Sequence, residues 1–232
     1  MISNQFLDLL FPPRCACCKR FGSWLCEACS DGFRRVDVPF CVRCGDVLTS
    51  GSLCSRCRTN PPRIDAVRSV FHFEDGLREA VHQFKYDGLS VLAGPLGVLM
   101  AAYWWEHPLA ADVIVPVPLH RKRVRDRGYN QSALLAKSVA SEHAVPVDLD
   151  TLVRRRATVP QVGLSIERRA QNVARAFECT CDVLAGKDVL LIDDVCTTGS
   201  TLEACAAALF DAGARKVRGL TLSRANFGAD AR

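Results

Sequence analysis

Residues 188–201 read DVLLIDDVCTTGST, and this stretch decides the class of fold. Its first part, Val189–Ile192, is a continuous apolar run, which is typical of a central parallel strand buried on both faces. Two acids, Asp193 and Asp194, follow the run, and a loop rich in hydroxyl side chains comes next. Residues 202–212 then have the pattern of a helix. The order of strand, loop and helix predicts an α/β fold with a mostly parallel sheet and flanking helices.

The loop after this strand is the predicted ligand site. In open α/β sheets, ligands bind beyond the carboxyl ends of the strands. Loop N–H groups and the N-terminus of a helix favour an anion there. The residues expected to hold a phosphate are Thr197, Thr198, Gly199, Ser200 and Thr201. Two carboxylates would repel a phosphate directly, so Asp193 and Asp194 are expected to face hydroxyl groups or a cation.

The length and composition bound the remaining possibilities. A chain of 232 residues has room for one full α/β domain and a small appendix. The hydrophobic fraction of 49% and the charged fraction of 24% exclude a disordered or fibrous protein. The formal net charge is +5, but zinc bound by eight cysteine thiolates would reduce it to about +1. Net charge is therefore no argument for nucleic-acid binding, which depends on local clusters of Lys and Arg.

Most of the 13 cysteines lie in four CxxC pairs near the amino terminus. The pairs are Cys15 and Cys18, Cys26 and Cys29, Cys41 and Cys44, and Cys54 and Cys57. Two such turns facing each other complete a tetrahedral site of four thiolates, which Zn²⁺ prefers. We therefore expect two structural zinc ions. Sequential pairing suits small hairpins, while interleaved pairing stays open and closes longer loops; Cys17 falls outside the spacing and is expected to be a spare thiol.

The cysteine-rich segment is expected to be a zinc-ribbon module over residues 1–60, followed by the α/β domain over 61–232. Its few large apolar side chains cannot make a core without metal. Residues 60–63, NPPR, end the module because two prolines make a stiff joint. The start of the chain lacks the features of a secretory signal, so we expect a cytoplasmic protein with reduced cysteines.

Residues 88–105 test the expectation that the chain has no membrane span. They carry no charge and reach the threshold length of a transmembrane helix. They also contain Gly94, Pro95 and Gly97. We expect a buried helix with Pro95 in its first turn, where proline is tolerated.

A basic segment follows a second apolar strand, which is expected over residues 112–117. Residues 120–127 read HRKRVRDR and are expected to form a loop near the edge of the sheet where the ligand binds. One small anion does not require so many cations. A DNA backbone is a second anion that this segment suits, and a solvated run of charges is the alternative.

The stretch IDDVCTTGST resembles the phosphoribosyl pyrophosphate (PRPP) motif of type I phosphoribosyltransferases. The resemblance implies that Asp193 and Asp194, the expected catalytic pair, face the ribose hydroxyls and that the loop over 197–201 holds the 5′-phosphate. It also implies a pyrophosphate loop that binds pyrophosphate and its Mg²⁺. The residues at that loop are Leu119, His120, Arg121 and Lys122. The residues left for DNA contacts are Arg123, Arg125 and Arg127.

Four further features narrow the resemblance to one family: the segment over residues 115–132, FKYDG at residues 84–88, a motif over 154–172 and the cysteine module. Together they make nearly all of residues 10–225 similar to the ComF family of competence-associated proteins (ComFC/GntX-like). The resemblance implies a double zinc ribbon joined to a type I phosphoribosyltransferase domain, and a role in DNA uptake during natural transformation. It also implies a ComFA-type helicase as partner in some members. Residues 158–172 correspond to the mobile active-site loop of related enzymes.

Two functions remain open at this stage. The favoured one is a DNA-handling protein with a site for PRPP or a nucleotide, in which single-stranded DNA is a further partner. The alternative is an active phosphoribosyltransferase that uses PRPP and Mg²⁺, where catalysis needs mainly positioning and charge stabilisation. A pocket for an acceptor base would favour the enzyme, and the sequence names no residues for one.

Overall fold

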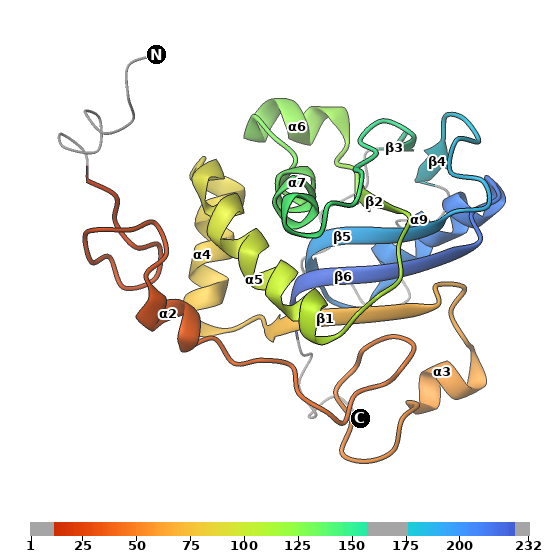
Figure 1. Cartoon of the computed structure of the whole chain (residues 1–232), viewed down its shortest axis with the longest axis horizontal. Coiled ribbons are helices and arrows are strands. Elements are labelled where there is room, and N and C mark those ends of the chain that lie inside the picture. Colours follow the sequence, from red (N-terminus) through yellow and green to blue (C-terminus); the bar gives the residue numbers. More distant parts are fainter. Residues whose placement is uncertain (1–11, 157–175, 226–232) are drawn as a thin grey trace.

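A computed structural model of the chain describes residues 12–156 and 176–225. These residues form an α/β unit around a four-stranded parallel sheet with the order β1-β6-β5-β2 (Figure 1). The strands are β1 (Ala66–His72), β2 (Val113–Pro116), β5 (Asp188–Cys196) and β6 (Lys216–Arg224). The predicted central strand is therefore present as β5, which lies between β6 and β2.

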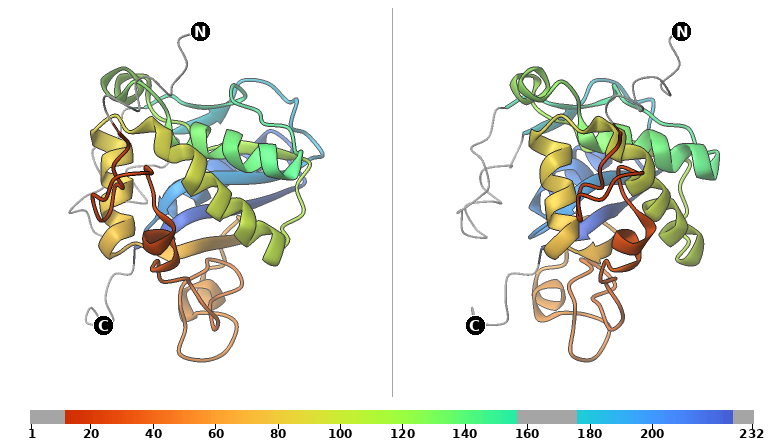
Figure 2. Two further views of the ribbon diagram at one scale, coloured as in Figure 1. Left: turned by 60° about the vertical axis from the view of Figure 1, so that its left-hand side comes forward. Right: turned by 90° about the vertical axis from the view of Figure 1, so that its left-hand side faces the viewer.

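Helices cover both faces of this sheet, as the sequence predicts (Figures 1 and 2). One face carries α4 (Asp75–Tyr86), α5 (Ala93–Glu106) and α7 (Gln131–His143), and the other carries α9 (Ser200–Asp211). The shorter elements are α2 (Glu27–Asp31), α3 (Ser55–Thr59), η1 (Ser90–Leu92), α6 (Arg121–Arg127) and the antiparallel pair β3 (Leu152–Arg154) and β4 (Phe177–Cys179).

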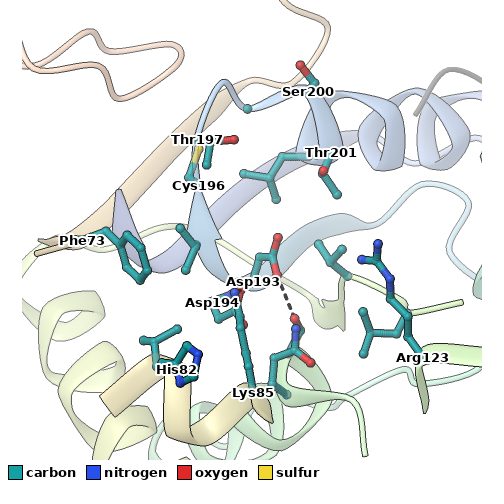
Figure 3. Close-up of a pocket in the computed structure, with 18 of the residues that line it drawn as sticks. Phe73, His82, Lys85, Arg123, Asp193, Asp194, Cys196, Thr197, Ser200 and Thr201 are labelled. Atoms are coloured by element: carbon teal, nitrogen blue, oxygen red, sulfur yellow. Dashed lines mark hydrogen bonds and ion pairs between the residues drawn. The ribbon is translucent and has the colours of Figure 1, made fainter. Parts of the chain in front are cut away.

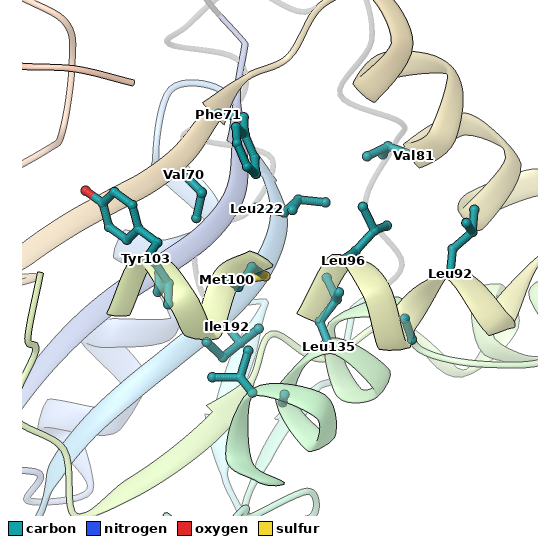
Figure 4. Packing of buried hydrophobic residues seen from close by; sticks show 14 of the residues in the cluster. Val70, Phe71, Val81, Leu92, Leu96, Met100, Tyr103, Leu135, Ile192 and Leu222 are labelled. Atoms are coloured by element: carbon teal, nitrogen blue, oxygen red, sulfur yellow. The ribbon is translucent and has the colours of Figure 1, made fainter. Parts of the chain in front are cut away.

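Strand β5 is apolar from Val189 to Ile192 because these side chains enter two different cores. Leu190 and Ile192 pack with the helices α4, α5 and α7. Val189 and Leu191 point to the opposite face and pack with α9. Figure 4 shows Ile192 beside Met100 of α5 in the first of these cores. A strand buried on both faces has no position for a polar side chain, which explains the continuous apolar run.

The uncharged stretch over residues 88–105 becomes the buried helix α5, with Pro95 in its first turn as predicted. Leu96 and Met100 are fully buried on its inner side. At Gly97 the helix lies directly against α7, and a Cβ atom there would approach the Cβ of Ser138 to 2.3 Å. Within residues 12–156 and 176–225, no helix is long and apolar enough to span a membrane.

The two halves of the cysteine-rich segment attach to the α/β unit at different places (Figure 1). The first half lies beside α4, where Gln83 Nε2 donates to the carbonyl of Ala16 at 2.8 Å. The second half lies along β1, where the backbone N–H of Val67 donates to the carbonyl of Arg43 at 2.7 Å. Ala16 and Phe33 of the first half belong to the main core. The boundary near residue 60 stays a prediction.

Candidate functional site

The four CxxC pairs form two separate clusters, and the pairing is sequential. The clusters are Cys15, Cys18, Cys26 and Cys29, and Cys41, Cys44, Cys54 and Cys57. Within each cluster the sulfur atoms lie within 4.8 Å of one another. Cys18 Sγ lies 3.6 Å from Cys26 Sγ, and Cys44 Sγ lies 3.7 Å from Cys54 Sγ. These separations match the edge of about 3.8 Å in a tetrahedron of thiolates around Zn²⁺.

The donors therefore fit two structural zinc ions with no open coordination position. Backbone N–H groups support the thiolate form: that of Cys26 donates to Cys15 Sγ at 3.5 Å, and that of Cys57 to Cys54 Sγ at 3.4 Å. Burial raises the pKa of Cys15, but hydrogen bonds from the backbone N–H groups of Cys26, Cys18 and Cys17 outweigh it and lower the pKa to about 6. Cys17 stands outside the cluster as predicted, since its thiol donates to the carbonyl of Gly76.

A cavity of about 620 Å³ lies where β5 and β2 end, between α4, α6 and α9 (Figure 3). Side chains from the predicted acid pair and from the predicted phosphate loop line the same cavity. The predicted residues that line it are Leu119, Arg123, Asp193, Asp194, Thr197, Gly199, Ser200 and Thr201. Thr198 lies in the same loop but faces away from this cavity, toward a second one. The cavity lies where ligands are expected in an open α/β sheet.

The two carboxylates have different surroundings. Asp194 is 3% exposed, and its Oδ1 lies 3.0 Å from Nζ of Lys85, which reaches it from α4 (Figure 3). Its Oδ2 is also buried and has no hydrogen-bond partner among the described residues. Asp193 Oδ1 accepts hydrogen bonds from Ser132 Oγ at 2.8 Å and from the N–H of Asp194 at 2.9 Å. The protein itself therefore supplies the acid pair with one hydroxyl group, from Ser132, and one cation, from Lys85. The buried Oδ2 of Asp194 remains as an acceptor without a partner among the described residues.

The acid pair carries less than two full negative charges near neutral pH. Burial, followed by the nearby carboxylate of Asp194, raises the pKa of Asp193 to about 7. Lys85 and the Ser132 hydroxyl act in the opposite direction but do not cancel this rise. A partly neutral Asp193 and a paired Asp194 repel a phosphorylated ligand much less than two free carboxylates would.

The loop after β5 has the geometry of an anion seat. Gly199 precedes α9 with a φ of 80°, a left-handed conformation that favours glycine. Thr198 Oγ1 and Ser200 Oγ lie 2.7 Å apart, so the hydroxyls hold the loop together. Among the described residues, none accepts a hydrogen bond from the backbone N–H of Thr198 or Gly199. These donors and the twelve-residue helix behind them favour a bound phosphate.

The expectation of a loop over residues 120–127 is wrong, because α6 begins at Arg121. His120 caps this helix, and its Nδ1 accepts from the N–H of Lys122 at 3.2 Å. Helical spacing sorts the cations by face instead of by order along the chain. Arg123 lines the cavity, whereas Arg121, Lys122 and Arg125 are exposed.

Arg127 is engaged within the protein. It donates to the side chain of Gln131, and its guanidinium lies 5.3 Å from the ring centre of Tyr86. The pyrophosphate and DNA roles of this segment stay predictions, and because Arg123 lines the cavity while Arg121 and Lys122 are exposed, the division between them is proposed anew below.

Several cavity residues have no signal in the sequence that predicts a place in the site. Lys85 belongs to the FKYDG motif, Ser132 ends the segment over residues 115–132, and Arg154 begins the motif over 154–172, but these residues alone indicate no role in the site. Phe73, His82 and Tyr86 form an aromatic wall on the α4 side. Residues 158–172, which are expected to correspond to the mobile active-site loop, lie outside the described residues.

Comparison with known proteins agrees with this architecture. The family "Double zinc ribbon domain" matches residues 6–58, and the family "Phosphoribosyl transferase domain" matches residues 130–230. The fold and site thus define a zinc-ribbon protein with a phosphoribosyltransferase domain.

Full-length relatives identify the family of the chain more narrowly than the two domain matches do. DNA utilization protein YhgH of Salmonella typhi is 35% identical, over 93% of this chain and 99% of the relative. Competence protein F of Haemophilus influenzae is 30% identical over 87% and 90%. Competence protein ComFC of Bacillus subtilis is 27% identical over 86% and 84%. The chain belongs to the ComF family.

Solved phosphoribosyltransferases show a more distant likeness. The glutamine PRPP amidotransferase from B. subtilis is 23% identical with a TM-score of 0.40, covering 57% of this chain and 26% of that one. A purine phosphoribosyltransferase from Pyrococcus horikoshii is 17% identical with a TM-score of 0.36, covering 58% and 72%.

Proposed function

We propose that this protein binds PRPP or a nucleotide in the cavity and assists the uptake or processing of DNA in natural transformation. One observation supports the proposed ligand. The acid pair and the hydroxyl-rich loop line a single cavity, and the buried Oδ2 of Asp194 in that cavity has no partner among the described residues. The DNA role is supported by the names of the relatives, which are competence and DNA utilization proteins.

Each part of the site has a distinct task in this proposal. Asp193 and Asp194 accept hydrogen bonds from the ribose hydroxyls, and the loop N–H groups with Ser200 and Thr201 hold the 5′-phosphate. Arg123 faces the pyrophosphate, together with the segment around Leu119. The acid pair also offers oxygen ligands of the kind that Mg²⁺ prefers. Mg²⁺ would supply charge neutralisation for the pyrophosphate of PRPP.

Calorimetry with PRPP, AMP and inorganic phosphate, with and without Mg²⁺, tests the ligand. We expect Asp193→Asn with Asp194→Asn to weaken the binding of both ribose ligands more than that of phosphate. Ser200→Ala should weaken all three, because it removes a donor from the phosphate seat. Equal losses for ribose ligands and phosphate in the double variant would contradict this division of tasks.

The exposed face of α6 is the proposed binding surface for single-stranded DNA. Changing Arg121, Lys122 and Arg125 to Ala should lower oligonucleotide affinity and reduce the slope of log affinity against log salt by roughly 0.7 for each DNA phosphate that the variant no longer neutralises. Arg123→Ala is the matched control on the same helix, and it should weaken PRPP more than DNA. An unchanged salt slope in the triple variant would exclude α6 from the DNA-binding surface. A ComFA-type helicase stays a predicted partner, to be tested by co-purification.

A second function, an active phosphoribosyltransferase, is favoured by the aromatic wall of the cavity. Phe73 and the rings of His82 and Tyr86, whose centres lie 4.9 Å apart, line the same cavity as the acid pair. Such a wall offers a base a surface for stacking. Release of pyrophosphate from PRPP that depends on an added nucleobase, and that Phe73→Ala slows, would establish turnover. No release with any of the common nucleobases would leave the binding function.

A further inference from the structure

The second zinc cluster contacts the phosphate loop through one side chain. Arg56, on helix α3 between the ligands Cys54 and Cys57, donates from Nη1 to the carbonyl of Thr198 at 3.2 Å. This contact joins residues 142 positions apart in the sequence. It crosses a second cavity, of about 630 Å³, which separates the zinc cluster from α9. The phosphate loop therefore lies between two cavities, and Arg56 reaches it from the side opposite the acid pair.

Arg56 is itself held in place by the zinc segment and the end of β6. Its Nη2 lies 3.3 Å from Asp46 Oδ2, while Asp46 Oδ1 accepts from Nη1 of the buried Arg224 at 2.7 Å. Arg224 also donates to the carbonyl of Cys44, which is a zinc ligand. The turn between Cys44 and Asp46 requires glycine: a Cβ at Gly45 would lie 2.6 Å from the carbonyl oxygen of Val67.

The contact with Thr198 decides which way a neighbouring donor points. In a trans peptide the C=O of one residue and the N–H of the next point in opposite directions. Holding the Thr198 carbonyl toward Arg56 therefore turns the N–H of Gly199 toward the acid-pair cavity, which Gly199 also lines. With φ at 80°, Gly199 gives this peptide little resistance to rotation. A rotated peptide would aim the carbonyl oxygen at a bound phosphate and repel it.

We propose that Arg56 is a positioning residue for the phosphate loop, through which the second zinc cluster sets the affinity of the cavity for phosphorylated ligands. The inference rests on the proposed function, because it assigns an anion to that loop. Arg56 touches the loop backbone and acts through the Gly199 N–H. The first zinc cluster lies beside α4 and, among the described residues, its segment makes no hydrogen bond to this loop.

The test compares Arg56→Gln with Arg58→Gln in the full-length, zinc-loaded protein. Arg58 lies on the same short helix, and among the described residues its side chain donates only to the carbonyl of Leu53 in its own segment. We expect Arg56→Gln to weaken binding of inorganic phosphate and ribose 5-phosphate roughly fivefold, the effect of one net hydrogen bond. Arg58→Gln should leave both affinities unchanged, and both variants should keep two zinc ions. Arg56→Lys keeps a cation and one donor that can bond to the Thr198 carbonyl, so it should recover part of the lost affinity.

An NMR readout separates this inference from the proposed function. In the ligand-free protein, the amide signal of Gly199 should shift or broaden in Arg56→Gln and not in Arg58→Gln, because the Thr198–Gly199 peptide gains a second orientation. If the wild-type protein binds neither probe, the proposed function fails while this signal still reports the coupling. An unchanged Gly199 signal with unchanged affinities overturns the inference. Equal losses in the two variants overturn it as well, because they would indicate a general effect of charge.

Discussion

Lys85 neutralises a carboxylate that the fold buries at the floor of the cavity. Its side chain is 19% exposed and the side chain of Asp194 is 4% exposed, so water screens the pair poorly. A buried ion pair is costly to break on one side only, because the remaining charge has neither water nor a partner. The pair therefore makes the site depend on both residues, although neither lies near the other in the sequence.

We expect Lys85→Met to destabilise the protein by about 3 kcal/mol, since it leaves Asp194 buried and uncompensated. Adding Asp194→Asn should recover most of that loss. Urea unfolding of the two single variants and the double variant gives the coupling free energy directly. Arg34→Met, which breaks an ion pair whose side chains are 59% and 38% exposed, should cost less than about 1 kcal/mol. Additive effects of Lys85→Met and Asp194→Asn would show that the pair is not coupled.

Asp193 predicts a pH dependence of stability. Its pKa is about 7 in the folded chain and 3.8 ordinarily, first because of burial and then because of Asp194. Between these values the folded state binds one proton more than the unfolded state, so stability falls as pH rises. Asp193→Asn cannot titrate, so the wild-type free energy of unfolding should decline relative to that of the variant from about pH 5 to pH 7. Parallel curves for the two proteins would mean that Asp193 titrates normally.

Helices α5 and α7 pack so closely at Gly97 that there is no room for a side chain. Among the described glycines, Gly97 is the one where an added Cβ would come nearest to a neighbouring atom. Gly97→Ala would bring a methyl group to 2.3 Å from the Cβ and Oγ of Ser138. We expect it to destabilise the protein by about 1–3 kcal/mol, although alanine is the better helix former. Gly94→Ala, in the same helix with open space around it, should be neutral or stabilising by less than about 1 kcal/mol. Thermal unfolding compares the two, and equal behaviour would contradict the close approach.

Helix α6 shows how secondary structure decides which residues of a basic segment face the cavity. In an extended loop the cations would be ordered by position along the chain. In a helix, residues four apart share a face, so Arg123 faces the cavity while Arg121 and Arg125 face outward. The proposed division between small-ligand and DNA contacts follows from this face and not from distance along the sequence.

For the whole molecule, the two zinc clusters support different regions. The segment that holds the first cluster packs on α4 through Cys17, Lys19 and Ala16, which lie between or beside its ligands. The second is tied to β6 through Arg224 and to the phosphate loop through Arg56. Each cluster thus stabilises a separate part of the α/β unit.

Cys26→Ser and Cys41→Ser should each release one of two zinc ions, measured by metal analysis. Hydrogen exchange should then rise in α4 for Cys26→Ser, and in the loop over residues 197–201 for Cys41→Ser, because the first half of the cysteine-rich segment bonds to α4 and Arg56 of the second half bonds to that loop. Disulfides among these cysteines, or increased exchange in the same regions for both variants, would contradict the assignment.

The sequence by itself determined the features that neighbouring residues encode. The strand, acid pair, hydroxyl loop and helix follow one another over residues 188–211. A continuous apolar run of this length is typical of a strand that is buried on both faces of the sheet, so the sequence predicts its position. The zinc ligands were equally readable, because a CxxC turn places two thiolates on one local structure. Local order along the chain is enough to predict such units.

Only the tertiary structure decided which distant residues meet. It paired the CxxC turns sequentially, brought Lys85 of α4 to Asp194, and placed Arg56 of the second zinc segment on Thr198. It also made residues 121–127 a helix and so chose which cations face the cavity. These contacts depend on how helices and zinc segments pack around the sheet, and that packing joins side chains whose separation in the sequence carries no periodic or motif signal.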